Sequence, residues 1–135
     1  MSTIVVLNSE YASLYFHTET KIVHHKLYSL LDSAHLREVL NEGTKLLGKY
    51  GAVKWLSDNR DIEAHSPEDT EWINTHWLPA AIDAGWKFWA LVVPDDVAAR
   101  MNMVEFVESF YAMGVRVMVF VEVEDAMRWL EKQDR

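Results

Sequence analysis

Charged and polar side chains follow the apolar segment at residues 53–57, and their types could support acid–base or anion-binding chemistry. Asp58 could act as a general base, and Arg60 could clamp an anion through its planar guanidinium group. The same residue types also suit a turn after a strand, with Arg60 in a surface ion pair. We expect the turn interpretation to hold. The polar residues of this segment are Asp58, Asn59, Arg60, Asp61, His65 and Ser66.

A second polar segment begins at Pro94, directly after the apolar residues 87–93. In open α/β sheets, ligands bind in the crevice beyond the carboxyl ends of the strands, so we expect the two polar segments to meet there. The second segment supplies Asp95, Asp96 and Arg100, with Asp96 as an alternative general base. Neither segment contains a recognisable pair of nucleophile and base. We therefore predict that the protein is not an enzyme.

Ser66 has two possible roles, and both depend on the helix predicted to follow it. It precedes Pro67 and lies three residues before Asp69, which is a capping-box arrangement with Asp in place of Glu or Gln. We expect the Ser66 hydroxyl to cap this helix. The alternative is phosphorylation of Ser66, because a helix N-terminus favours negative charge. Glu68, Asp69 and Glu71 would repel that phosphate.

The His residues do not have the spacing of a metal site. The chain has no Cys, so thiolate ligands and disulfides are excluded. His24 and His25 are adjacent in a predicted strand and should point to opposite faces of the sheet. His65 and His76 are not one helical turn apart, as paired ligands on a helix would be. We predict no metal and no cofactor.

The chain contains six Trp residues, a high number for 135 residues. Core packing, with each indole N–H bonded to a partner, is the interpretation we favour. A pocket for a small apolar or aromatic ligand is the alternative. The Trp residues around the second predicted helix and the strand after it are Trp72, Trp77, Trp86 and Trp89.

Hydrophobic periodicity predicts the elements that must position these side chains. Alternating or continuous apolar residues predict strands at 4–7, 12–17, 22–28, 53–57, 87–93 and 115–121. Apolar residues three and four apart predict helices at 36–50, from 66 onward, at 102–113 and at 123–130. Asp32 or Ser33 can cap the first helix, and Gly51 can end it in a left-handed conformation. Asn102 can cap the third.

The order of these segments predicts the fold. The turn at 18–21 is too short for a crossover, so its two strands should pair antiparallel. The later alternation of strands and helices predicts right-handed crossovers between parallel strands. We therefore predict one α/β domain over residues 1–135, with a mixed β-sheet that is antiparallel at its N-terminal strands and parallel in its second half.

Two segments carry a resemblance to a known family. KWLSDNRDIEAHSPEDTEWINTHWLPAAIDAG resembles the middle of the SpoIIAA-like proteins, which share the STAS-like fold of the anti-sigma-factor antagonists, and FVEVEDAMRWL is similar to their closing helix. The resemblance implies a four- to six-stranded sheet with helices largely on one side. It also implies a regulatory module that binds a protein partner.

The same resemblance bears on phosphorylation and on ligands. Antagonists of this fold are phosphorylated on a Ser or Thr within an Asp-Ser-Ser/Ala-Gly motif after the equivalent strand. This chain has Asp58-Asn59-Arg60-Asp61 at that place, without the motif. The fold is also similar to that of the CRAL-TRIO lipid carriers, which implies apolar-ligand binding as an alternative function.

The second predicted helix has apolar residues on two sides. Leu78 and Ile82 fall opposite the side expected to face the sheet, and Pro79 between them frees the Thr75 carbonyl. We expect Leu78, Ile82 and Thr75 to form a homodimer interface, with singly exposed apolar residues as the alternative. The side expected to face the sheet carries Ile73, Trp77, Ala80 and Ala84.

Composition limits the partners. Thirteen Lys and Arg against twenty-one Asp and Glu give a net charge of −8, which repels nucleic acid. The N-terminal residues lack a signal-peptide pattern, and apolar runs are strand-sized, so we expect a cytoplasmic protein without a membrane span. We predict a non-enzymatic regulatory or protein-interaction module. The alternative is a carrier or sensor of a small apolar or aromatic ligand or lipid.

Overall fold

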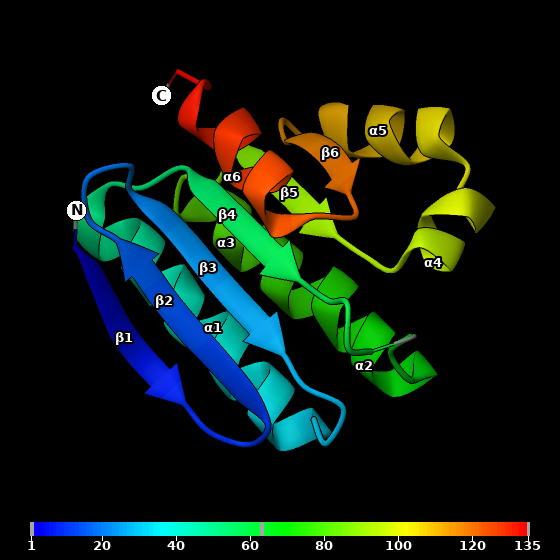
Figure 1. The fold of residues 1–135 in the computed structure, drawn as a ribbon, viewed down its shortest axis with the longest axis horizontal. Coiled ribbons are helices and arrows are strands. Elements are labelled where there is room, and N and C mark those ends of the chain that lie inside the picture. The colour runs from blue at the N-terminus through cyan, green and yellow to red at the C-terminus, as the bar shows by residue number, and fades with distance from the viewer. Residues whose placement is uncertain (1, 63, 135) are drawn as a thin grey trace.

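The computed structural model describes residues 2–62 and 64–134, which form one six-stranded sheet with helices on both faces (Figure 1). The elements in chain order are β1 (Thr3–Asn8), β2 (Ala12–His17), β3 (Ile22–Leu27), α1 (Ser33–Tyr50), β4 (Lys54–Asp58), α2 (Pro67–Trp72), the π-helical turn η1 (Ile73–Trp77), α3 (Leu78–Asp83), β5 (Phe88–Val92), α4 (Asp95–Arg100), α5 (Met103–Tyr111), β6 (Arg116–Phe120) and α6 (Val123–Glu131).

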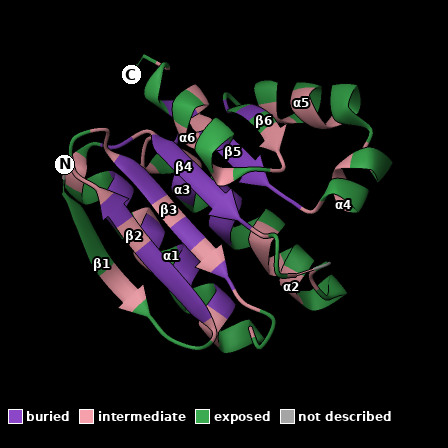
Figure 2. Ribbon diagram, viewed as in Figure 1, coloured by how far each residue is buried: buried purple, intermediate pink, exposed green. Residues whose placement is uncertain are grey.

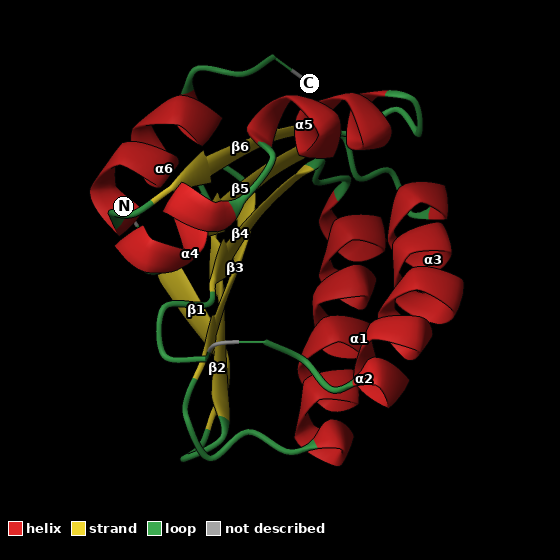
Figure 3. Cartoon of the chain, turned by 90° about the vertical axis from the view of Figure 1, so that its right-hand side faces the viewer, coloured by secondary structure: helices red, strands yellow, loops and turns green. Residues whose placement is uncertain are grey.

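The strands lie in the sheet in the same order as in the chain, from β1 to β6. Strands β1, β2 and β3 pair antiparallel, and β3, β4, β5 and β6 pair parallel. The predicted mixed sheet is therefore confirmed. Helices α1, α3 and α5 cover one face, and α6 covers the other face over β4, β5 and β6 (Figure 3). The helices thus lie largely on one side.

Helix α1 shows how local signals set its bounds. The Asp32 carboxylate accepts the backbone N–H of His35, so Asp32 rather than Ser33 is the cap. Gly51 ends the helix with a positive φ of 62°, a conformation that glycine adopts without a steric penalty. The larger buried side chains of this helix are Leu36, Val39, Leu40, Leu46 and Leu47.

The predicted orientation of the second helix is wrong from residue 78 onward. Leu78 was expected opposite Trp77, yet both are buried, with 7% and 4% of their surfaces exposed. Ala81 is fully buried, whereas Ala80, which was expected to face the sheet, is exposed. Ile82 is half-buried against the core. The helix therefore presents a different face to the sheet than an unbroken α-helix would.

The π-helical turn η1 causes this rotation. The N–H of Leu78 bonds to the carbonyl of Ile73, five residues back, so one extra residue enters the turn. The wider turn lies directly before Pro79, which has no N–H and would crowd the carbonyl four residues earlier. Of the predicted interface residues only Thr75 is exposed, and its hydroxyl donates to the Glu71 carbonyl. The homodimer stays a prediction, but Leu78 and Ile82 cannot form its interface because they pack in the core.

Helix α4 was not predicted. Its residues were expected to form a polar loop after β5, but a six-residue helix follows Pro94 and packs Val97 and Ala98 against the core. Asn102 caps the next helix, α5, by accepting the backbone N–H of Glu105, as predicted. In the part of the chain that the structure describes, no helix has the length and apolar character to span a membrane.

The larger core lies between the sheet and helices α1, α3 and α5, where the strands are largely buried (Figure 2). Aromatic rings form the centre of this core. Neighbouring ring centroids lie 5.0 to 6.4 Å apart in tilted or edge-to-face arrangements, which suit aromatic packing. Trp72 is half-buried on α2, where it stacks on His76. The rings at the centre belong to Trp55, Trp77, Trp86 and Trp89.

We predict that Gly43→Ala destabilises the fold by roughly 1–3 kcal/mol, because the added methyl group would overlap the Trp55 indole. Its Cβ would lie 2.7 Å from Cζ2 of Trp55 and closer still to Cη2. Gly48→Ala is the matched control in the same helix, because open space surrounds its Cβ position. It should stabilise by about 0.5–1 kcal/mol through helix propensity. Urea unfolding measures both. A Gly43→Ala variant as stable as Gly48→Ala would contradict this packing.

Candidate functional site

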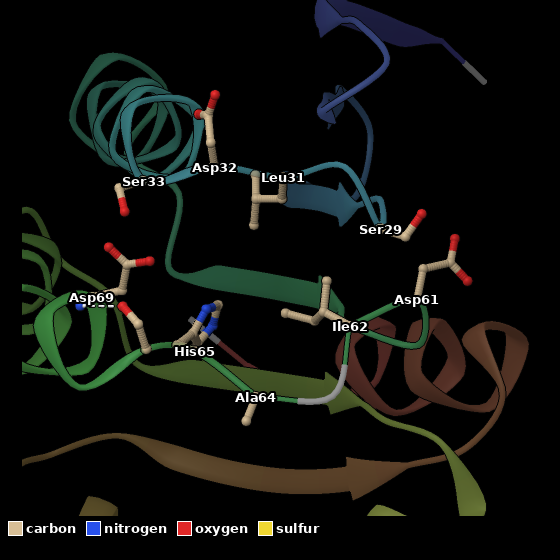
Figure 4. Close-up of a pocket in the computed structure, with 10 residues that line it drawn as sticks. Ser29, Leu31, Asp32, Ser33, Asp61, Ile62, Ala64, His65 and Asp69 are labelled. Carbon is tan, nitrogen blue, oxygen red and sulfur yellow. Dashed lines mark hydrogen bonds between the residues drawn. The ribbon is translucent and has the colours of Figure 1, made fainter.

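Some of the polar residues after β4 line a surface pocket of about 490 Å³ at the carboxyl edge of the sheet, here named the outer pocket, but Asp58, Asn59 and Arg60 are not in its described lining. Its opposite wall is the loop from β3 to α1. Figure 4 shows Asp32 and Ser33 on one side and His65 and Asp69 on the other. The described lining includes none of Asp95, Asp96 and Arg100, so the structure does not bring the two predicted polar segments together there. The outer pocket is lined by Ser29, Leu31, Asp32, Ser33, Asp61, Ile62, Ala64, His65, Ser66 and Asp69.

The residues of α4 form their own surface pair. Arg100 Nη1 lies 3.3 Å from Asp96 Oδ2, and both side chains are about 70% exposed (68% and 73%). Asp95 lies at the start of the same helix and is exposed. Such a solvated pair contributes little to stability. Asp96 and Arg100 thus form an exposed pair on a helix, and the expectation of a turn is wrong for Asp95, Asp96 and Arg100.

Asp58 and Arg60 do not form the surface ion pair that was expected. The Asp58 side chain is 3% exposed, and Arg60 holds both of its oxygens through Nε and Nη2 at 2.9 Å. Burial alone would raise the pKa of Asp58. The hydrogen bonds from the Arg60 side chain and backbone, together with its charge, outweigh that effect and lower it. Loss of Arg60 would leave the buried Asp58 carboxylate unpaired, which is strongly destabilising. The ion pair therefore has a structural role.

Strand alternation places this pair away from the inner side of the sheet. Successive side chains of a strand point to opposite faces, so Asp58 and Leu56 share one face while Ser57 and Trp55 share the other. Leu56 packs in the smaller core under α6, and Trp55 packs in the larger core. Ser57 accordingly faces the larger core, where its hydroxyl accepts the N–H of Trp89 at 2.8 Å.

His25 lies on the same face as Ser57 and is a second buried polar group. The N–H of Trp55 donates to His25 Nδ1 at 3.0 Å. Because Nδ1 accepts, the ring proton must be on Nε2, which donates to Asn59 Oδ1 at 2.9 Å. Burial lowers the pKa of His25 to about 4, partly opposed by the bond to Asn59 and the charge of Asp58. His25 is therefore neutral at pH 7, with both nitrogens occupied.

A second, smaller pocket of about 190 Å³ lies against these groups between the sheet and the helices, and we name it the inner pocket. His65 lines both pockets, which places them next to each other. Burial lowers the pKa of His65, and the charge of Asp69 opposes this effect. The apolar wall consists of Leu27, Leu36, Leu40, Ile73, Trp77, Trp89, Leu91 and Phe106. The polar groups are His25, Ser57, Asn59 and His65.

Two buried polar atoms at these pockets have no hydrogen-bond partner among the described residues. One is the indole nitrogen of Trp77, which lines the inner pocket, and the other is Oδ1 of Asp69, which lines the outer pocket. The expectation that each clustered indole N–H has a partner is thus wrong for Trp77. Asp69 donates its backbone N–H to the Ser66 hydroxyl at 3.1 Å, so the predicted cap is confirmed.

Sequence reasoning selected Asp58 and missed His25, Ser57 and Trp55. One available signal was the Ser within an otherwise apolar strand, because a buried hydroxyl needs a hydrogen-bond partner. Another was the adjacent pair His24 and His25, since both faces of a central strand are covered and at least one imidazole must be buried. Among residues 2–62 and 64–134, no three His, Asp or Glu side chains are grouped to hold a metal ion.

We predict that the protein loses stability as the pH falls from about 6.5 toward 4. Burial lowers the pKa of His25 to about 4 and that of His24, further affected by the charge of His17, to about 3. Both folded-state pKa values lie below the ordinary value of 6.5. The contribution of each His to the free energy of unfolding is therefore complete above pH 6.5. It is lost as the pH falls below 6.5, because the unfolded chain then binds protons that the folded protein does not. Between pH 7.5 and 5 the loss should be ~2 kcal/mol for each His.

Urea unfolding at several pH values measures this loss. His24→Gln should flatten the decline, since Gln does not titrate, whereas His76→Gln on the exposed side of η1 should leave the decline unchanged. Wild-type stability that is the same at pH 7.5 and pH 5 would show that the imidazoles of His24 and His25 do not resist protonation.

Comparison of the chain with protein-family models, with curated proteins and with solved structures finds no match. The resemblance to the SpoIIAA-like proteins therefore stays a prediction, and the candidate site rests on its own geometry.

Proposed function

We propose that the protein is a non-enzymatic module that binds a small apolar or aromatic ligand in the inner pocket, as a carrier or sensor. The observation that carries this proposal is the pocket itself, about 190 Å³ enclosed mainly by Leu, Ile, Phe and Trp side chains with a few polar groups. Ligand sites are commonly built in this way. An engineered apolar cavity of about 150 Å³ in another protein binds benzene, so the volume suits one ring with a small substituent.

The state of the acidic and basic groups supports a binding role over catalysis. Asp58 is held by Arg60 and lies on the face of the sheet opposite Ser57. His25 is neutral with both ring nitrogens bonded, so it has no free position for a proton from a substrate. A ligand would reach the inner pocket from the outer pocket past His65, which lines both.

We predict that toluene raises the melting temperature of the wild type. A ligand at about ten times its Kd stabilises by about 1.4 kcal/mol, which for a domain of this size is roughly 3–5 °C. Ile73→Trp should fill the inner pocket and abolish the shift. Ile82→Trp is the matched control, because Ile82 is also half-buried on the next turns but is not in the lining. Absence of any shift in the wild type, over a series of apolar probes up to naphthalene, refutes the proposed function.

A second candidate function is binding of a protein partner, including a second copy of the chain, at the free edge of β6. Large apolar side chains are exposed on α5 and β6, among them Val104 at 69%, Tyr111 at 64% and Met118 at 42%. Tyr111 and Met118 line a groove of about 290 Å³ beside this edge, together with Trp129 of α6. Strand edges and exposed apolar surface both favour association. The expected homodimer and regulatory role would use this surface in place of Leu78 and Ile82.

We predict that the wild type associates at high micromolar concentration and that Val104→Glu/Met118→Glu stays monomeric. Two buried carboxylates per chain would be unpaired in such an interface, which is strongly unfavourable. Sedimentation velocity over a concentration series measures the state of both proteins. Ile4→Glu on the opposite edge strand, where Ile4 is 41% exposed, is the control and should still associate. A monomeric wild type refutes the self-association, and a double variant that still dimerises excludes the β6 edge.

A further inference from the structure

The indole N–H of Trp77 is a buried donor that the protein itself does not satisfy. Trp77 is 4% exposed, and its Nε1 has no partner among the described residues. The three neighbouring indoles are all paired, with His25, the Phe88 carbonyl and Ser57 as acceptors. A buried polar group without a partner is unfavourable and is uncommon in folded proteins. Since Trp77 lines the inner pocket, a bound molecule there is the natural acceptor.

Ser57 and Asn59 also present donors at the inner pocket. The Ser57 hydroxyl accepts from Trp89 and keeps its own proton to donate. The Asn59 carboxamide oxygen accepts from His25, which leaves its NH₂ group as the free end. Both nitrogens of His25 are already bonded. Together with the N–H of Trp77, these donors favour a ligand that supplies an acceptor.

The inner pocket does not offer a charge to pair with an ionic ligand. Its described lining contains no Lys, Arg, Asp or Glu. Burial lowers the pKa values of His25 and His65, so both imidazoles are neutral at pH 7. An anion transferred into such a site would lose its hydration without gaining a counter-charge. An uncharged acceptor, such as a ketone oxygen, meets the same donors without that loss.

We propose that the ligand of the inner pocket is a small uncharged aromatic or alicyclic molecule with one hydrogen-bond acceptor, held by the indole N–H of Trp77. This inference rests on the proposed function and specifies its ligand class. A pocket of about 190 Å³ accommodates one six-membered ring and a substituent of two or three heavy atoms. The apolar walls bind the ring, and the N–H orients the acceptor.

Acetophenone and α-methylstyrene test this inference, because they have the same shape and differ only in a carbonyl oxygen against a CH₂ group. We expect the full-length wild type to bind acetophenone about fivefold or more tightly, the preference that one buried hydrogen bond supplies. In ¹H–¹⁵N spectra, acetophenone should move the Trp77 indole proton downfield, and α-methylstyrene should not. Benzoate, an anion of similar size, should bind more weakly than acetophenone and should not move the Trp77 indole signal.

Two variants complete the test. Trp77→Phe removes the proposed donor and should reduce the preference for acetophenone well below fivefold, while α-methylstyrene still binds. Trp86→Phe is the control from the same aromatic cluster, since Trp86 donates to the Phe88 carbonyl and does not line the pocket, so the preference should persist. If Trp77→Phe does not fold, the assigned indole signal of the wild type decides alone.

The possible failures are distinguishable. Equal affinities with an unmoved Trp77 signal would show that the N–H bonds to a buried water, which overturns this inference and leaves apolar-ligand binding intact. Benzoate binding as tight as that of acetophenone would overturn the uncharged class. If acetophenone, α-methylstyrene and toluene all fail to bind, the proposed function fails, and this inference fails with it.

Discussion

The packing of Trp55 against Gly43 sets the distance between α1 and the sheet, and the rest of the larger core is arranged around it. The Trp55 ring occupies the space where any Cβ at position 43 would lie, so helix and sheet approach as closely as an indole permits. The Trp55 ring also contacts Trp77 and Trp86, and its N–H bonds His25. One close approach thus connects the aromatic cluster to the buried polar groups.

The bond from Trp55 has an electrostatic consequence for the candidate site. Because it occupies Nδ1 of His25, it selects the tautomer that donates from Nε2 to Asn59. Asn59 then turns its NH₂ group to the remaining side, as a donor at the polar end of the inner pocket. Asp58, a buried acid of this region, is on the other face of the sheet with Arg60. The inner pocket therefore combines apolar walls, hydrogen-bond donors and no charge.

The π-helical turn η1 links the helical layer to the same pocket. It contains Ile73 and Trp77, both of which line the inner pocket, and it rotates α3 so that Leu78 and Ala81 face the core. Extra-residue turns of this kind are often found at functional sites, because they redirect side chains that a regular helix would point elsewhere. Here the turn places Trp77, whose indole N–H has no partner among the described residues, in the lining of a pocket formed by residues from His25 to Phe106.

Local chemistry in the sequence alone determined the strands, helix α1 and the caps Ser66 and Asn102, and it narrowed the cap of α1 to Asp32 or Ser33. These features depend on the period of apolar residues and on groups within a few positions of one another, which a sequence displays directly. Strand alternation also predicts that His24 and His25 point to opposite faces, and that Ser57 and Asp58 do.

Only the tertiary structure decided which of these faces holds the pocket and which residue is its unpaired donor. That choice depends on α6 covering one face of β4 and the Trp cluster covering the other, contacts between residues far apart in the chain. The wide turn η1 could not be predicted either, because no motif in the sequence marks it. Its extra residue rotates every later position of the helix by about 100° relative to a regular α-helix. For that reason a helical wheel of a regular α-helix predicts that Leu78 is exposed, whereas it is buried in the folded protein.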